Sequence, residues 1–301
     1  MSHYRFASFA QFLASTPKLI LVGLWMAIGM GTASLTAMPF LPQDTEGKQT
    51  ANTVVPLLHA HAHNDYHHQR PLHEALEAGF CSIEVDVYPQ AGKLLVGHDT
   101  WELKPDRTLE SLYLDPLKKI VQENQGQVYP KGPEVWLLVD IKNEGTQGYR
   151  LLTKTLQNYR SMISGIDQQG NYQSRAIRVV VSGDRDQQAI LDSQGRWAGM
   201  DGRVTDLKSR AATDANAIPL ISDRWGSHFR WNGVGEMPAA ELEKLQSIVQ
   251  QTHQQGRRLR FWATPEKPAL WNVLRANGVD LIGTDQLNEL KNFFSEPDAE
   301  K

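Results

Sequence analysis

Cysteine is almost absent from this chain of 301 residues, because Cys81 is its single cysteine. No intramolecular disulfide can form, so a disulfide-stabilised scaffold is excluded and the fold has to be held by packing. An excess of basic charge is missing as well. The 31 basic and 34 acidic side chains give a formal net charge of −3, which excludes a broadly basic nucleic-acid-binding protein. The Gly-x-Ser-x-Gly motif of many serine hydrolases does not occur either.

Acidic residues are also lacking at the amino terminus, where Asp44 is the first in the chain. The apolar run Leu19–Met30 follows basic residues and precedes small residues that fit a cleavage site. We therefore expect residues 1–37 to be a signal peptide and the protein to be exported, to the periplasm or the medium. The alternative is an uncleaved membrane anchor, although a spanning helix needs about 20 apolar residues. Residues 38–53 are expected to be a linker.

The remaining composition is that of an ordinary globular protein, with 41% hydrophobic residues. Short apolar segments rich in β-branched residues alternate with amphipathic segments, a pattern typical of a parallel sheet built from βα units. The predicted strands are Val54–Ala62, Cys81–Tyr88 paired with Lys93–Gly97, Val135–Lys142, Ile177–Ser182, Gly199–Val204, Ile218–Ser222, Leu259–Ala263 and Val279–Gly283. The predicted helices are Leu72–Glu77, Leu109–Gln122, Tyr149–Ser161, Arg185–Asp192, Pro238–Gln254 and Pro268–Ala276. Eight strand units over residues 54–294 predict a single (β/α)8 TIM barrel, for which about 250 residues are typical, and residues 295–301 are expected to be a disordered tail.

Acidic side chains stand at the ends of two of these strands. Glu84 and Asp86 are two residues apart on an otherwise apolar strand, so both carboxylates share one face. Asp140 and Lys142 repeat this spacing at the end of another apolar run. Because unpaired charges inside a barrel are costly, the carboxylates imply a cation. Oxygen ligands from Glu84, Asp86 and Asp140 suit one Mg²⁺ or Ca²⁺ ion better than zinc.

Histidines are concentrated near the same strand ends. The segment from His59 to His68 closes the first predicted strand, and His98 follows the strand around Lys93. Imidazole groups there can act as acid or base at neutral pH. The alternating His59, His61 and His63 offer a zinc site as an alternative, but one strand face gives them little freedom to form a tetrahedron.

Several short motifs in one order resemble the phospholipase-C-like (PLC-like) phosphodiesterase superfamily of TIM barrels. They are His63-Asn64-Asp65-Tyr66, Pro71-Leu72, Ala75-Leu76, Gly79, Ser82 to Tyr88, Leu95 to Asp99, Asp140-Ile141-Lys142, Phe261 to Thr264 and Gly278 to Asp285. The nearest branch resembles the altered-inheritance-of-mitochondria-6-like proteins, also called HNDY-type after the first motif. Glycerophosphodiester phosphodiesterases and sphingomyelinase D enzymes are similar more distantly.

The resemblance implies roles for individual residues. It makes His63 and His98 the catalytic pair, assigns one divalent metal ion to Glu84, Asp86 and Asp140, and implies that Lys142 contacts the phosphate. Trp262 is expected to line the pocket, and Asn64 to bind substrate or orient His63. Thr284 and Asp285 are expected to be structural caps. Asn64 stands where glycerophosphodiester phosphodiesterases have an arginine, so specificity for glycerol phosphate is not implied.

The expected function is that of a phosphoric diester hydrolase or lyase, dependent on Mg²⁺ or Ca²⁺, that acts on a glycerophosphodiester or a phospholipid head group. A lipid substrate would bring the protein to a membrane surface, and neither nucleic acid nor a protein partner is expected. The alternative is a non-catalytic barrel that binds ligands and retains the metal site, because a fold does not guarantee chemistry.

Overall fold

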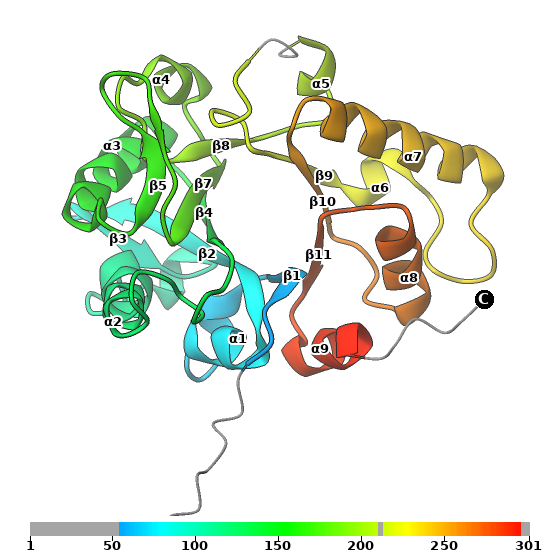
Figure 1. Ribbon diagram of the computed structural model, residues 1–301, viewed down its shortest axis with the longest axis horizontal. Helices are drawn as coiled ribbons and strands as arrows, with labels where there is room; N and C mark the ends of the chain where they lie inside the picture. The colour runs from blue at the N-terminus through cyan, green and yellow to red at the C-terminus, as the bar shows by residue number, and fades with distance from the viewer. Residues whose placement is uncertain (1–53, 210–212, 296–301) are drawn as a thin grey trace, which may run out of the picture. The chain divides into compact units, whose positions relative to one another are not determined.

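Eight parallel strands close on themselves in the computed structural model, which describes residues 54–209 and 213–295 (Figure 1). In order around the barrel they are β1 (Leu57–Ala62), β2 (Phe80–Gln90), β4 (Val135–Ile141), β7 (Ile177–Gly183), β8 (Gly199–Gly202), β9 (Leu220–Arg224), β10 (Arg258–Trp262) and β11 (Leu281–Thr284). The barrel closes because β1 pairs in parallel with both β2 and β11. The predicted TIM barrel is thereby confirmed.

Three shorter strands lie outside this ring. β3 (Lys93–Val96) pairs antiparallel with β2 and forms a hairpin, which is why the two predicted segments counted as one unit. β5 (Ile163–Ile166) pairs with β7, and β6 (Tyr172–Gln173) pairs antiparallel with β5. The sequence analysis did not identify β5 or β6, since neither has a long apolar run.

Helices surround the strands. They are α1 (His73–Ala78), α2 (Asp115–Glu123), α3 (Gly145–Leu156), α4 (Gln187–Asp192), α5 (Asp206–Ser209), α6 (Trp225–His228), α7 (Ala239–Gln254), α8 (Pro268–Ala276) and α9 (Leu287–Ser295). Short helical turns occupy Asp65–His67, Thr100–Glu102, Glu110–Leu114 and Gln157–Tyr159. Each predicted helix is present, but the predicted helix Leu109–Gln122 is divided into a π-helical turn and α2. The short helices α5 and α6 and the terminal α9 were not predicted.

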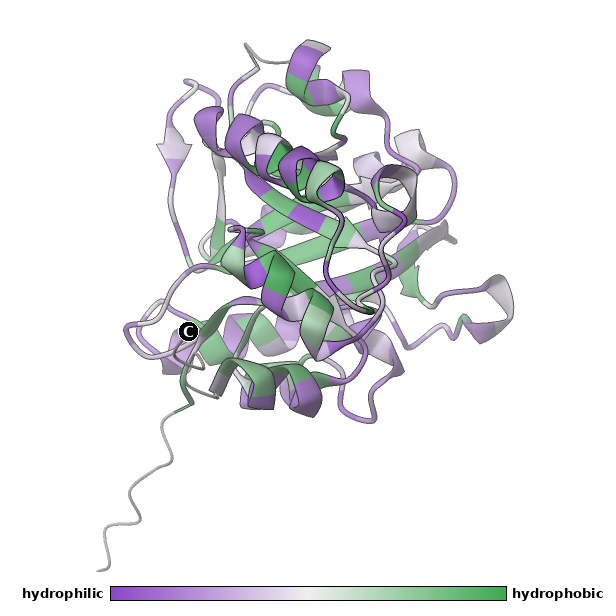
Figure 2. Ribbon diagram, turned by 90° about the vertical axis from the view of Figure 1, so that its right-hand side faces the viewer, coloured by the Kyte–Doolittle hydropathy of each residue, from purple (hydrophilic) through white to green (hydrophobic). Residues whose placement is uncertain are grey.

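The core has two parts because successive strand residues face opposite sides. The larger part fills the space between barrel and helices and includes Phe80, Val85 and Leu152. The smaller part consists of Trp136, Leu138, Val180, Leu220 and Leu281. These residues share the inner face of the barrel with the polar side chains: Leu138 lies two residues before Asp140, Val180 two before Ser182 and Leu220 two before Ser222. An apolar layer therefore closes the barrel below the site. Figure 2 shows the strands mostly hydrophobic and the helices banded with hydrophobic and hydrophilic residues.

The predicted signal peptide or anchor, the linker and most of the predicted tail lie outside the described residues. Among the helices within 54–209 and 213–295, none is long and apolar enough to cross a membrane.

Candidate active site

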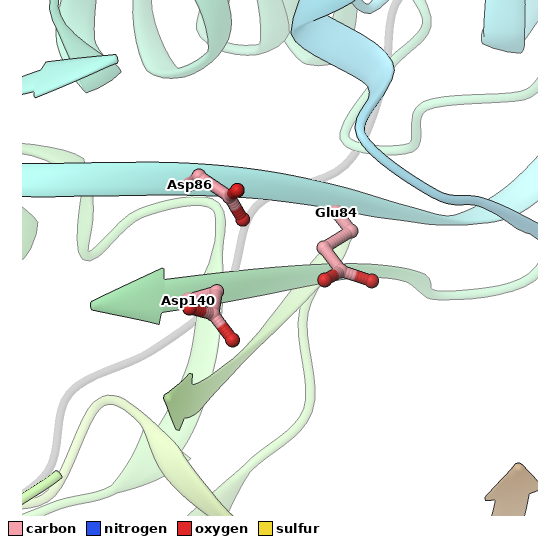
Figure 3. A group of neighbouring side chains, drawn as sticks. All are labelled: Glu84, Asp86 and Asp140. Atoms are coloured by element: carbon pink, nitrogen blue, oxygen red, sulfur yellow. The ribbon is translucent and has the colours of Figure 1, made fainter. Parts of the chain in front are cut away.

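Three carboxylates converge at the carboxyl ends of β2 and β4. Strand alternation places Glu84 and Asp86 on the inner face of β2, and the parallel register sets Asp86 beside Asp140 of β4. One oxygen from each carboxylate lies within 4.8 Å of the others, as the sequence predicted (Figure 3). In TIM barrels this end of the strands is where active sites lie.

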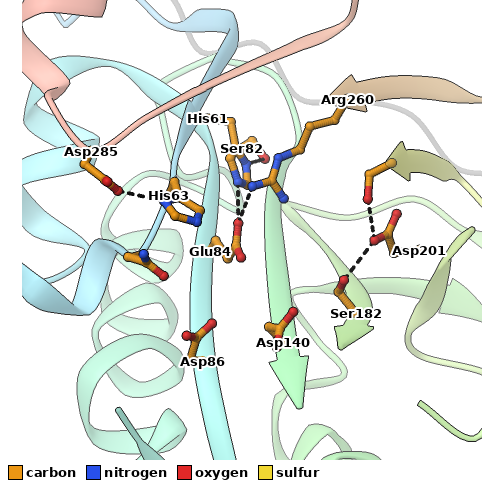
Figure 4. A network of polar contacts seen from close by, with 12 residues as sticks. His61, His63, Ser82, Glu84, Asp86, Asp140, Ser182, Asp201, Arg260 and Asp285 are labelled. Atoms are coloured by element: carbon orange, nitrogen blue, oxygen red, sulfur yellow. Dashed lines mark hydrogen bonds and ion pairs between the residues drawn. The ribbon is translucent and has the colours of Figure 1, made fainter. Parts of the chain in front are cut away.

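Glu84 is fixed by two basic side chains. Arg260 Nη2 of β10 lies 2.6 Å from Glu84 Oε2, and His61 Nε2 lies 2.8 Å from the same oxygen (Figure 4). Burial alone raises the pKa of Glu84, but Arg260 and His61 outweigh it and hold the pKa well below its usual range. Burial and the charge of Arg260 lower the pKa of His61 to about 3, so this imidazole is neutral at physiological pH.

Asp86 is held through one oxygen in the same way. Its Oδ2 accepts a hydrogen bond from Tyr66 at 2.6 Å and contacts Lys142 Nζ at 2.7 Å and His98 Nδ1 at 3.0 Å. Its Oδ1 is buried and has no hydrogen-bond partner among the described residues. A buried carboxylate oxygen without a partner is costly, and a divalent cation would satisfy it.

Asp140 completes the set of oxygen ligands. Burial raises the pKa of Asp140 to about 6, and the nearby carboxylates of Glu84 and Asp86 act in the same direction against the charge of Lys142. Lys142 Nζ lies 3.3 Å from Asp140 Oδ1. A Cβ atom at Gly183 would lie only 2.5 Å from that oxygen, so the adjacent strand needs glycine there. Three hard oxygen donors with one unsatisfied atom fit Mg²⁺ or Ca²⁺.

His98 reaches this site through the β2–β3 hairpin. The antiparallel return of β3 brings the residues that follow it back beside Asp86. The backbone N–H of His98 donates to Glu102 Oε2 at 2.7 Å, and the backbone carbonyl of His98 accepts from the Tyr88 hydroxyl at 2.8 Å. The imidazole is half exposed, so it is fixed by Asp86 and still open to a substrate.

His63 lies at the end of β1 and is paired with Asp285, which follows β11. His63 Nδ1 lies 2.7 Å from Asp285 Oδ1. Burial lowers the pKa of His63, but the bond to Asp285 outweighs it and raises the pKa above its ordinary value. The expectation that Asp285 is only a structural cap was incomplete, because its side chain orients a candidate catalytic histidine.

A pocket of about 140 Å³ adjoins His63. Trp262 lines this pocket and is 37% exposed. Asn64 has a left-handed backbone, with φ of 46°, and its side-chain amide lies 2.9 Å from the hydroxyl of Tyr66. Asp65 points away from the carboxylates, since it accepts from Leu72 N and from Tyr113.

The three histidines of the zinc alternative do not converge. His59 Nδ1 bonds to the backbone oxygen of Asp280, whereas His61 bonds to Ser82 and Glu84 inside the barrel. Among the described residues, Glu84, Asp86 and Asp140 are the group whose ligand atoms lie close enough to hold one ion.

Sequence reasoning missed Tyr66 and Arg260. Both are buried polar residues that contact a carboxylate of the metal-ligand set. The inward alternation of Arg260 on β10 was the available signal, because an arginine on the inner face of a barrel needs a carboxylate partner.

Comparison with known proteins agrees with this geometry. Residues 48–197 match the model of the AIM6-like phosphodiesterase domain. The chain is thus one of the PLC-like phosphodiesterase barrels, as its motifs predicted.

Curated relatives extend the similarity along most of the chain. The Altered inheritance of mitochondria protein 6 homolog of Arthroderma benhamiae is 25% identical over 265 residues, with 78% of this chain and 83% of the relative covered. Altered inheritance of mitochondria protein 6 of Eremothecium gossypii is 28% identical over 284 residues, with 83% and 73% covered. These similarities support the AIM6-like branch that the motifs predicted.

Two solved structures are similar at a lower level. A glycerophosphodiester phosphodiesterase from Parabacteroides distasonis has a TM-score of 0.47 and 15% identity, with 79% of this chain and 98% of that chain covered. A second one, from Agrobacterium tumefaciens, has a TM-score of 0.47 and 14% identity, with 80% and 100% covered.

Proposed function

We propose that this protein is a metal-dependent phosphoric diester hydrolase or lyase that uses His63 and His98 for acid–base catalysis. The observation that carries the proposal is the buried carboxylate triad, in which Asp86 leaves one oxygen without a partner. His63 and His98 are each bonded to a carboxylate through Nδ1, His63 to Asp285 and His98 to Asp86. This arrangement leaves Nε2 of each ring as the atom that can exchange a proton with a substrate.

The chemistry of diester cleavage needs the groups that the site contains. Attack by a hydroxyl group on phosphorus forms one P–O bond and breaks the P–O bond to the leaving alcohol. One histidine takes the proton of the attacking hydroxyl, and the other gives a proton to the leaving oxygen. Lys142, which is partly exposed, provides a positive charge for the phosphate. A bound Mg²⁺ or Ca²⁺ ion would add charge neutralisation at the phosphate oxygens.

The nucleophile is either water or a hydroxyl of the substrate itself. Water gives a phosphate monoester directly, whereas an adjacent substrate hydroxyl gives a cyclic phosphate. The candidate substrates are glycerophosphodiesters and phospholipid head groups, because they share the diester that this set of charges fits.

The test is to compare His63→Asn and His98→Asn with His59→Asn in the presence of Mg²⁺ or Ca²⁺. His59 is the matched control. It lies on β1, which ends directly before His63, but its side chain is exposed and bonds to the backbone oxygen of Asp280. We expect diester cleavage to fall by a factor of about 100 or more in each of the first two variants, the range for loss of acid–base catalysis. Cleavage at the wild-type rate in both would refute the proposal and favour a non-catalytic binding protein.

A further inference from the structure

Two arginines lie beside the carboxylate triad on the catalytic face. Arg185 follows β7 by two residues, and Arg203 follows β8 directly. Since these strands are neighbours in the barrel, both side chains start from the same rim. Neither arginine was assigned a role in the sequence analysis or in the catalytic site.

A polar row connects these arginines with the metal ligands. The parallel register aligns Asp86 with Asp140, and Asp140 with Ser182 of β7. Ser182 Oγ then donates to Asp201 Oδ2 of β8 at 2.8 Å (Figure 4). The row therefore runs from the triad across two further strands, in one layer of the barrel.

Arg203 is anchored through a single nitrogen atom. Its Nη1 lies 2.8 Å from Asp201 Oδ2 and donates to the carbonyl oxygen of Gly202 at 3.0 Å. Asp201 is fully buried and also accepts a hydrogen bond from Ser222 at 2.6 Å. The anchor is thus rigid, while the other nitrogens of the partly exposed guanidinium are left for a ligand.

The charge of Arg185 is less well paired than that of Arg203. Its Nη1 donates to the carbonyl oxygen of Gly183 at 3.1 Å, and its buried Nε has no partner among the described residues. No ion pair joins it to a carboxylate in the described part of the chain. Burial lowers the pKa of Arg185, and the charge of Arg203 lowers it further, although Asp201 and Asp140 oppose this. Two partly buried arginines that follow adjacent strands, one of them without a carboxylate partner, indicate that an anion fits beside them.

We propose that Arg185 and Arg203 form an anion-binding subsite next to the metal triad, which takes a second phosphate group carried by the diester substrate. The inference rests on the proposed function and adds a substrate class to it: diesters whose head group carries a phosphate monoester. Guanidinium groups suit this ligand because their planar forks match two phosphate oxygens at once. Lys142 and the metal site remain for the phosphate that is cleaved.

The kinetic test uses two substrates that differ only in this group, glycerophosphoglycerol and its terminal phosphate monoester. In the full wild-type chain we expect kcat/KM to be about tenfold or more higher for the phosphorylated substrate, the effect of one charge-assisted hydrogen bond. In Arg185→Gln this ratio should fall to near one, and Arg185→Lys should retain part of it. Arg150→Gln, which removes an exposed arginine of α3, is the control and should keep the wild-type ratio.

Two kinetic results would overturn the inference. In both of them the ratio stays at the wild-type value in Arg185→Gln. In the first, kcat/KM is unchanged for both substrates, and in the second it falls equally for both, which would mean that Arg185 serves the cleaved phosphate or the fold. Circular dichroism of each variant checks that the barrel is intact.

A binding test keeps the inference separate from the proposed function. Inorganic phosphate is titrated calorimetrically into the metal-stripped protein and its Arg185→Gln, Arg150→Gln and Lys142→Gln variants. We expect Kd to rise about tenfold in Arg185→Gln and to stay unchanged in Arg150→Gln. If only Lys142→Gln weakens binding, the subsite does not exist. If the wild-type protein cleaves no diester but Arg185→Gln still weakens phosphate binding, the proposed function fails and the anion site stands.

Discussion

Replacement of Arg260 by methionine should destabilise the barrel in a way that a metal ion can repair. Arg260 is 3% exposed and Glu84 is 6% exposed, so their ion pair is inside the barrel. Methionine keeps much of the side-chain volume and removes the charge. Glu84 would then be a buried carboxylate with one remaining partner, His61.

The magnitude follows from the cost of an unpaired buried charge. Removal of one partner from such a pair costs about 3–5 kcal/mol, and the bond from His61 places the cost near the lower end, at about 3 kcal/mol. In a domain of this size 1 kcal/mol corresponds to about 2–4 °C in Tm, so the expected decrease is about 6–12 °C. A bound divalent ion neutralises Glu84, so Mg²⁺ or Ca²⁺ should raise the Tm of the variant more than that of the wild type.

The assay is thermal unfolding of chelator-treated protein with and without added metal. Arg258→Met is the matched control, because Arg258 lies on the same strand but donates to backbone oxygens of Leu58 and Asp280. It should cost about 1 kcal/mol, or about 2–4 °C. Equal decreases in Arg260→Met and Arg258→Met, with no extra rescue by metal, would refute this account of Glu84.

Two further predictions concern the hydrogen bonds around the histidines. Tyr66→Phe removes the hydroxyl that donates to Asp86, so we expect a stability loss of about 1 kcal/mol and weaker metal binding by calorimetry; unchanged metal affinity would contradict the role of Tyr66. Asp285→Asn removes the bond that raises the pKa of His63, so the limb of the pH–rate profile that reports His63 should move to lower pH. A limb that does not move would contradict the role of Asp285. The stabilisation from protonated His63 is complete below its ordinary pKa of 6.5 and is lost as pH rises through the raised folded value, so Asp285→Asn should lower Tm at about pH 5 more than at about pH 9.

Sequence reasoning predicted the barrel because its signals are local. The barrel strands other than β8 have an apolar run, and the alternation around Glu84 and Asp86 was sufficient to place both carboxylates on the inner face. His98 was placed next to them by motif resemblance, and the hairpin of β2 and β3 explains that position. The short helices α5 and α6 were missed because one helical turn leaves no periodic pattern.

The partners of the site residues could not be predicted in the same way. Asp285 lies 222 positions from His63 along the chain, and only closure of the barrel between β1 and β11 brings them together. Arg260 reaches Glu84 across the barrel interior, a contact set by strand tilt and side-chain length. Such contacts depend on tertiary structure, so a single sequence gives no spacing from which to infer them.

Phosphorus NMR on the chelator-treated full chain tests the central claim most directly. The protein is incubated with glycerophosphodiesters, lysophospholipids and inositol phospholipids, and Mg²⁺ or Ca²⁺ is then restored. The account predicts cleavage of at least one diester after metal addition and no cleavage by Asp86→Ala; a cyclic-phosphate resonance would identify attack by a substrate hydroxyl. Stoichiometric metal binding without turnover of any diester would contradict the account and identify the barrel as a binding protein.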